Sequence, residues 1–223
     1  AQKPLGETVT RLVQLYTAWG KPAQAAAWKE KPGALQDSLA RVESLRQQNK
    51  LGEAETVQRQ IVENMRRRFG TESLSAAGAI KELALILIDA GKPLDAEPLA
   101  RESLSIRTKL YPAVSWLIAT SRSAVGKSLL GQKHYAEAEP LLLSAYAEIK
   151  ERGPKPPTVP HLESLVSVAK ALVALYQATN QPARSAEWQK ILEEEGRSLS
   201  ALQASAPRPS TPPSSPPAAR PPQ

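Results

Sequence analysis

The sequence predicts an all-α protein, a right-handed superhelical solenoid of about five antiparallel helix pairs followed by a disordered Pro-rich tail. Three observations support this fold class. A short turn motif recurs five times, and apolar residues flank each copy at helical spacing. The composition, 41% hydrophobic but only 4% aromatic, is also short of strand-forming side chains. A chain of 223 residues with this apolar content can bury a substantial core.

The recurring motif is a tight turn followed by a small residue. Its copies end at residues 25, 54, 96, 138 and 185, so the spacings are 29, 42, 42 and 47. The third and fourth copies continue alike, since residues 96–99 and 138–141 both read Ala-Glu-Pro-Leu. Fixed spacing of this kind is typical of solenoids, in which each helical hairpin buries its apolar face against its neighbours.

Each copy lies between two amphipathic stretches. Gly91 and Asn180 tolerate the left-handed conformation that ends a helix, and Pro93 and Pro182 suit the first turn of the next one. The small residue after the turn allows two antiparallel helices to approach closely. We therefore expect ten helices in five pairs, at about 6–19 and 22–30, 35–48 and 52–69, 73–90 and 93–110, 113–131 and 134–152, and 161–179 and 182–196.

Proline marks the expected boundaries. Pro32-Gly33 separates a terminal helix pair at 1–33, which we expect to end a preceding array, from the main array at 34–205. Residues 206–223 include 8 prolines and should be disordered, because they cannot bury enough apolar surface to offset chain entropy. Pro98 and Pro140 fall inside second helices, where we expect a local bend. The Pro-rich loop 153–160 accounts for the longest spacing.

The repeat resembles the tetratricopeptide (TPR) repeat. Residues 135–142, Tyr-Ala-Glu-Ala-Glu-Pro-Leu-Leu, look like the kinesin-light-chain class of TPR. A longer stretch, which runs from Tyr111-Pro112 through Trp116, 120–123, 126–132 and 172–176 to 183–188, is similar to the C-terminal TPR regions of large bacterial serine/threonine protein kinases. The resemblance covers about four-fifths of the chain and implies a TPR-like array that binds other proteins.

The closing motif of this stretch occurs twice, at 12–28 and 172–188. In the family it resembles a terminal cap, so we predict that Trp28 and Trp188 pack in the core rather than stack on a ligand. One feature departs from the pattern. Kinesin-light-chain repeats carry a pair of Asn on the first helix that grips a peptide backbone, whereas the matching positions here, at 10–11, 81–82, 123–124 and 170–171, hold none.

Motifs for catalysis and metal binding are missing from the sequence. There is no Gly-x-Gly, His-Arg-Asp, Asp-Phe-Gly or Gly-x-Ser-x-Gly, so we expect neither kinase nor hydrolase activity from this segment. His134 and His161 lack partners at metal-ligand spacing, and we interpret them as turn or capping residues. The chain has no cysteine, which excludes disulfides and thiolate sites. We predict no cofactor.

The charge balance bears on the partner. A net charge of +7 favours acidic ligands mildly, but the base-stacking aromatics of nucleic-acid binders are scarce. We interpret Arg66-Arg67-Arg68 first as a solvated helix end and second as a docking patch. The longest apolar run, 83–88, is too short to span a membrane, and the first residues lack the build of a signal peptide and an initiator Met. We therefore expect the chain to be processed or a segment of a longer protein.

The candidate binding residues are basic side chains on the first helices, which line the concave surface of a TPR solenoid. They are Arg11, Arg41, Lys81, Arg122, Lys127 and Lys170. A mostly basic groove would suit an acidic peptide or a C-terminal carboxylate. The alternative is that these are ordinary solvent-facing charges.

The sequence thus favours a non-catalytic protein-protein interaction module, the C-terminal scaffolding or sensory TPR region of a bacterial signalling kinase. A free-standing TPR adaptor is the alternative, and a helical-repeat nucleic-acid binder is the alternative of another class, disfavoured because such readers repeat at shorter, more regular intervals. The compartment would follow the host: cytoplasmic, or at the cell envelope if the kinase is membrane-anchored.

Overall fold

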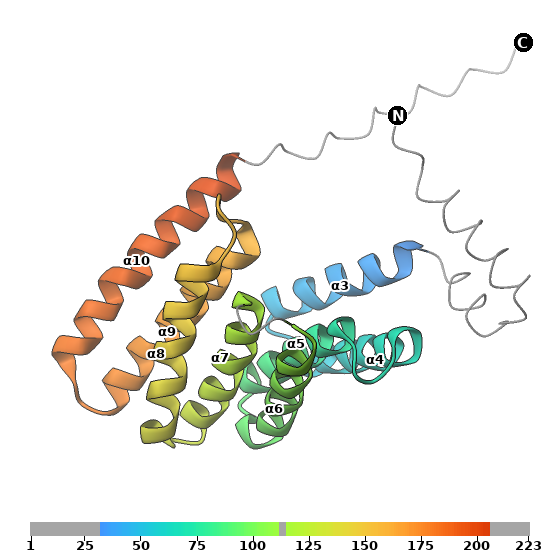
Figure 1. Ribbon diagram of the computed structural model, residues 1–223, viewed down its shortest axis with the longest axis horizontal. Helices are drawn as coiled ribbons and strands as arrows, with labels where there is room; N and C mark the ends of the chain where they lie inside the picture. The colour runs from blue at the N-terminus through green and yellow to red at the C-terminus, as the bar shows by residue number, and fades with distance from the viewer. Residues whose placement is uncertain (1–31, 112–114, 206–223) are drawn as a thin grey trace, which may run out of the picture.

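The computed structural model describes residues 32–111 and 115–205 and contains eight helices in this part of the chain (Figure 1). They are α3 (Pro32–Gln47), α4 (Leu51–Phe69), α5 (Leu74–Asp89), α6 (Pro93–Leu110), α7 (Trp116–Gly131), α8 (Tyr135–Arg152), α9 (Val159–Ala178) and α10 (Pro182–Ser205). The described residues form no strand, so the all-α prediction is confirmed. The first predicted pair, with Arg11 and Trp28, and the tail 206–223 lie outside the described residues.

Helix boundaries differ from the prediction by two residues or more at four places. α7 begins at Trp116, three residues later than expected. α3 begins at Pro32, so the expected break at Pro32-Gly33 lies in its first turn, where proline costs little. α9 begins at Val159, two residues early. α10 continues to Ser205 instead of ending near 196, because Leu199 and Leu202 extend its apolar stripe onto the core. α6 and α8 each continue through their internal proline.

The four hairpin turns share one geometry. Asn49, Gly91, Lys133 and Asn180 have φ of 57°, 72°, 67° and 54°. In each turn the next residue donates its N–H to the carbonyl five positions back, as Lys92 does to Leu87 at 2.8 Å and Gln181 to Tyr176 at 2.8 Å. This pairing is a Schellman motif, which satisfies helix-end carbonyls and reverses the chain. The motif found in the sequence is therefore a helix C-cap.

Lys133 is the strained member of this set, because a lysine has no side-chain means of stabilising the left-handed conformation. We expect Lys133→Gly to raise the free energy of unfolding by about 1 kcal/mol. Gly91→Ala should lower it by a similar amount through backbone strain alone, since an added Cβ at Gly91 meets nothing within 4 Å. Urea unfolding of both variants tests this, and the same sign for both would contradict it.

The hairpins follow one another along a curved array, from α3 and α4 at one end to α9 and α10 at the other (Figure 1). Consecutive helices pack together throughout. In addition α5 packs against α7, and α7 against α9, whereas no two even-numbered helices in the described part of the chain pack as closely. The odd-numbered helices therefore form the inner side of the array and the even-numbered ones the outer side.

Small residues line the contact inside each hairpin. Ala54, Ala96 and Ala138 are fully buried, and Ser185 takes the same position in the last hairpin. Trp188 packs edge-on against Tyr146, with ring centroids 4.9 Å apart, and joins the core as predicted. α9 has the length and apolar composition of a membrane span, but it packs against α8 and α10 as a core helix does.

Ion pairs on the outer side connect successive hairpins. Arg66 of α4 bonds Glu102 of α6 at 2.8 Å, so the first arginine of the 66–68 run is an inter-repeat contact rather than a solvated helix end. Lys92 bonds Glu55 at 2.9 Å in the same way. These pairs join the outer helices of successive hairpins.

Candidate peptide-binding groove

A groove lies on the inner side of the array, between α3, α5, α7 and α9, with a cavity volume of about 760 Å³. Its charged lining residues are Glu43, Arg46, Lys81, Glu82, Asp89, Lys127, Glu163 and Lys170. Hydroxyl and apolar groups cover the floor between them, chiefly Thr120, Ser123, Ser164, Ser167, Leu85, Trp116, Leu117 and Pro160. The groove thus draws on all four first helices that the structure describes.

Helical spacing explains which side chains face the groove. On α7, residues 116, 120, 123 and 127 line it, and on α9, residues 160, 163, 164, 167 and 170 do. Both sets follow the i, i+3, i+4, i+7 pattern of one helix face. The same face carries Lys81, Ser123 and Lys170, the positions that match the asparagines of kinesin-light-chain repeats.

The structure brings three of the six predicted groove residues together. Lys81, Lys127 and Lys170 line the groove on successive first helices. Arg122 lies outside it, because it is about 100° around the helix from Ser123 and pairs with Glu148 of α8. Arg41 is exposed on α3 outside the lining, and Arg11 lies outside the described residues.

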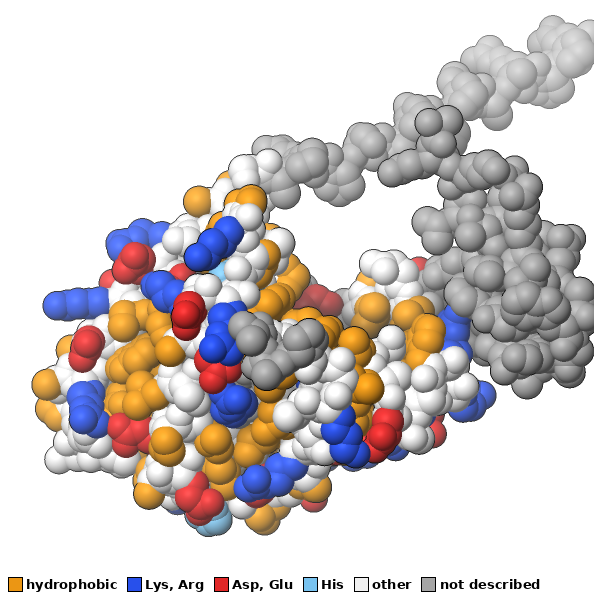
Figure 2. Space-filling model, viewed as in Figure 1, with side chains coloured by type: hydrophobic (Ala, Val, Ile, Leu, Met, Phe, Trp, Pro, Cys, Tyr) orange, Lys and Arg blue, Asp and Glu red, His pale blue; other side chains and the backbone are white. Residues whose placement is uncertain are grey.

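The lining is mixed in charge rather than mostly basic, because four carboxylates face four cations. Two of the possible pairs are formed. Lys81 meets Glu82 at 2.5 Å, and Arg46 of α3 meets Asp89 of α5 at 2.9 Å. Charges of both signs also occur on the face shown in Figure 2, where basic and acidic side chains are interspersed.

Burial and neighbouring charges shift the pKa values of two groove carboxylates. Desolvation raises the pKa of Glu82, but the charge and hydrogen bond of Lys81 outweigh it and leave that pKa below its ordinary value. Desolvation raises the pKa of Glu163, and the nearby carboxylates of Glu43 and Glu82 raise it further. Glu43 of α3 and Glu163 of α9 both line the groove, so these two helices contribute to the same surface.

Two lysines of the groove have no carboxylate partner within the described part of the chain. Lys170 is exposed. Lys127 is partly buried and donates to the Ser167 hydroxyl at 2.5 Å. Burial lowers the pKa of Lys127 to about 8, and the positive charge of Lys81 acts in the same direction. The groove therefore has two cations able to receive an anionic group.

The lowered pKa predicts a pH dependence of stability. A group whose folded pKa is below its unfolded value destabilises the fold while charged, so the penalty acts below about pH 8 and disappears as the pH rises toward 10. Lys127→Met should therefore exceed wild type in unfolding free energy by about 1–2 kcal/mol at pH 7 and lose most of that advantage at pH 10. Urea unfolding at both pH values measures this, and an equal difference at both would contradict it.

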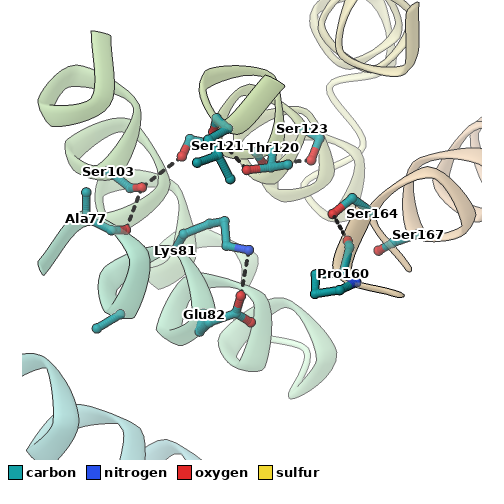
Figure 3. Close-up of polar contacts among 12 residues, drawn as sticks. Ala77, Lys81, Glu82, Ser103, Thr120, Ser121, Ser123, Pro160, Ser164 and Ser167 are labelled. Carbon is teal, nitrogen blue, oxygen red and sulfur yellow. Dashed lines mark hydrogen bonds and ion pairs between the residues drawn. The ribbon is translucent and has the colours of Figure 1, made fainter. Parts of the chain in front are cut away.

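A buried polar network supports the floor. Arg107 of α6 donates to Leu117 O at 2.7 Å, Thr120 Oγ1 at 2.8 Å and Ser121 Oγ at 3.0 Å, all on α7. Ser103 donates to Ala77 O of α5 at 2.8 Å and pairs with Ser121 at 2.9 Å. Figure 3 shows this chain of hydroxyls beside Lys81, which points from α5 toward α7 and α9. The network fixes three helices and so the spacing of the lining.

Neither histidine belongs to the groove. His134 precedes α8 at the turn. His161 is buried, and its Nε2 lies 2.9 Å from Ile149 O at the end of α8, which makes it a capping residue as predicted. No group of three or more possible metal ligands occurs in the part of the chain that the structure describes.

Solved structures share this architecture. BtubC (BKLC) from P. vanneervenii matches with a TM-score of 0.57 and 16% identity, over 94% of this chain and 85% of that one. A Podosopora anserina protein described as a kinesin light chain with nearly identical TPR-like repeats matches with a TM-score of 0.51 and 18% identity, over 90% of this chain and 96% of that one. The fold is a TPR-like helical solenoid. Identities this low show the fold alone.

No family model matches the chain, and no curated protein matches it. The similarity to these solved TPR-like structures confirms the TPR-like part of the resemblance seen in the sequence. Its bacterial-kinase part stays a prediction.

Proposed function

We propose that the chain is a non-catalytic interaction module whose inner groove holds an extended segment of a partner protein. The observation that carries the proposal is the groove itself, built from the first helices of four successive hairpins, with Lys127 and Lys170 unpaired to any carboxylate in the described structure. A TPR-like solenoid presents such a surface for peptide recognition.

The mixed charge of the lining limits which partner segments fit the groove. Lys127 and Lys170 would receive an acidic side chain or a C-terminal carboxylate, as the basic residues led us to expect. Glu43 and Glu163, which both line the groove, would repel a uniformly acidic ligand. The partner segment that fits is therefore one with an acidic group beside neutral or basic residues, rather than an acidic run. The same mixture disfavours a nucleic-acid backbone.

The resemblance at 135–142 and 111–132 supports placing this module in the C-terminal region of a bacterial signalling kinase. A free-standing adaptor is the alternative. The complete reading frame distinguishes the two, because the kinase context requires a catalytic domain with a Gly-rich loop and a His-Arg-Asp motif upstream.

The groove proposal is tested with peptides selected against the protein from a random display library. Lys127→Gln combined with Lys170→Gln should weaken the tightest peptide by about tenfold or more, since two charge-assisted contacts are lost. Lys190→Gln, a charge-removing change on an exposed site of α10 outside the groove, should have little effect. Fluorescence anisotropy gives the dissociation constants. If Lys190→Gln weakened peptide binding equally, the effect would reflect the net charge of the protein and not the groove.

A further inference from the structure

We propose that Lys127 is a site of covalent acylation, at which the side-chain amine takes an acyl group from small thioesters that enter the inner groove. The acylation itself follows from the surroundings of Lys127. Its consequence, loss of a cation from the groove and weaker binding of an acidic segment, rests on the proposed function.

The position of Lys127 combines access with a weakly stabilised ammonium group. Its side chain lines the open cavity, so a small reagent can reach it. Its only hydrogen-bond acceptor in the described structure is the Ser167 hydroxyl, a neutral group. A neutral acceptor stabilises an ammonium group less than a carboxylate does, so the ammonium group loses its proton more readily.

Charged groups of α3, α5 and α9 line the groove together with this amine. Those of α3 and α5 are Arg46, Lys81, Glu82 and Asp89, and those of α9 are Glu163 and Lys170. Both nearby carboxylates of α5 are already engaged, Glu82 by Lys81 and Asp89 by Arg46. Asp89 and Glu82 still favour the charged form of Lys127, but the cations Lys81 and Arg46 oppose them. Burial is the largest influence, and the net result is that the pKa of Lys127 is lowered to about 8.

Other lysines of the array are held differently. Lys150 meets Glu195 at 2.8 Å, and Lys92 and Lys109 meet Glu55 and Glu72 at 2.9 and 2.8 Å. The bond to Glu195 raises the pKa of Lys150 above its ordinary value. A carboxylate-bound ammonium is not a nucleophile, so these lysines are internal references for slow reaction.

The reaction is a transfer of one acyl group. The neutral Lys127 amine attacks the thioester carbonyl carbon, a C–N bond forms, and the C–S bond breaks with departure of the thiolate. The amine loses one proton to solvent, where it balances the thiolate released. The product is an uncharged amide.

The test is a timed reaction of the whole chain with S-acetyl-N-acetylcysteamine, without any peptide ligand, followed by mass spectrometry of every lysine. At pH 7.5 an amine of pKa about 8 is roughly one-quarter neutral, against about 0.1% for an ordinary lysine. The lower basicity of the Lys127 amine also makes it a weaker nucleophile, which offsets part of this advantage. We therefore expect Lys127 to be acetylated at least about tenfold faster than Lys170 and Lys150. Its rate should level off above about pH 8.5, whereas that of Lys150, whose pKa the bond to Glu195 raises, should keep rising. A rate equal to that of Lys170, or one that keeps rising with pH beyond 9, would overturn the proposal.

Lys81→Gln supplies a second variant that keeps the reactive amine. It removes a neighbouring cation and frees Glu82, so it should slow acetylation of Lys127 at pH 7.5 severalfold. An unchanged or faster rate would contradict the role of the surrounding charges. The labelling result does not depend on peptide binding. Fast labelling of Lys127 combined with unchanged peptide affinity after Lys127→Gln would therefore refute the proposed groove function and leave the acylation site standing.

Discussion

Tyr176→Ala is expected to lower the free energy of unfolding by about 3–5 kcal/mol and to detach the last hairpin. Tyr176 is 2% exposed and is the largest of the fully buried side chains. Its hydroxyl donates to Glu139 of α8 at 2.8 Å, and the Arg184 guanidinium lies 5.4 Å from its ring centroid. The side chain therefore joins α9 to both α8 and α10. In a linear array a loss at the end repeat melts that repeat first.

The measurement is urea unfolding followed by helical circular dichroism, with two matched variants. Tyr176→Leu should cost less, about 1–2 kcal/mol, since Leu87 and Leu129 take the equivalent place in earlier hairpins. Tyr176→Phe isolates the hydroxyl and should cost about 1 kcal/mol. If alanine were no worse than phenylalanine, the packing role assigned to Tyr176 would be wrong.

Gly126→Leu should cost about 3 kcal/mol or more and disturb the contact between α7 and α8. A Cβ added at Gly126 would lie 2.9 Å from Leu142 Cγ and 3.3 Å from Leu141 Cβ. Leu142 is itself fully buried, so it has no free space into which to move. A Cβ added at Gly196 in α10 meets nothing within 4 Å, and we expect Gly196→Leu to stabilise by up to about 1 kcal/mol, because leucine favours the helix.

Thermal unfolding of this pair compares packing with helix propensity for one substitution. We expect Gly126→Leu to lower Tm and Gly196→Leu to raise it. A rise at both sites would mean that α7 and α8 are less closely packed than the contact with Leu142 indicates.

The fold was largely predictable from sequence because its signals are local. Three of the four turns place Gly or Asn in the left-handed position, and a small residue follows five positions later, so the hairpins could be placed to within a few residues. Lys133 broke the pattern, yet the equal spacing identified its turn. The end of α10 was missed because Gly196 resembles a helix end, while the apolar contacts of Leu199 and Leu202 depend on the folded array.

The groove was predictable only in part, because its composition depends on which helix face turns inward. Lys81, Lys127 and Lys170 were found from their position on first helices, but Arg122 was included although it lies on the wrong side of α7. The carboxylates of Glu82 and Glu163 were missed. The polar stripes at helical spacing on α7 and α9 carried the signal that could have identified the lining. The pairing between α3 and α5 is a tertiary contact with no mark in the local sequence.

The most direct test is a crystal structure of the chain bound to its tightest library-selected peptide. The account predicts an extended peptide in the groove between α3, α5, α7 and α9, with an acidic group within about 4 Å of Lys127 or Lys170 Nζ. A peptide seated instead on the outer helices α4, α6, α8 and α10, with the groove open, would contradict it.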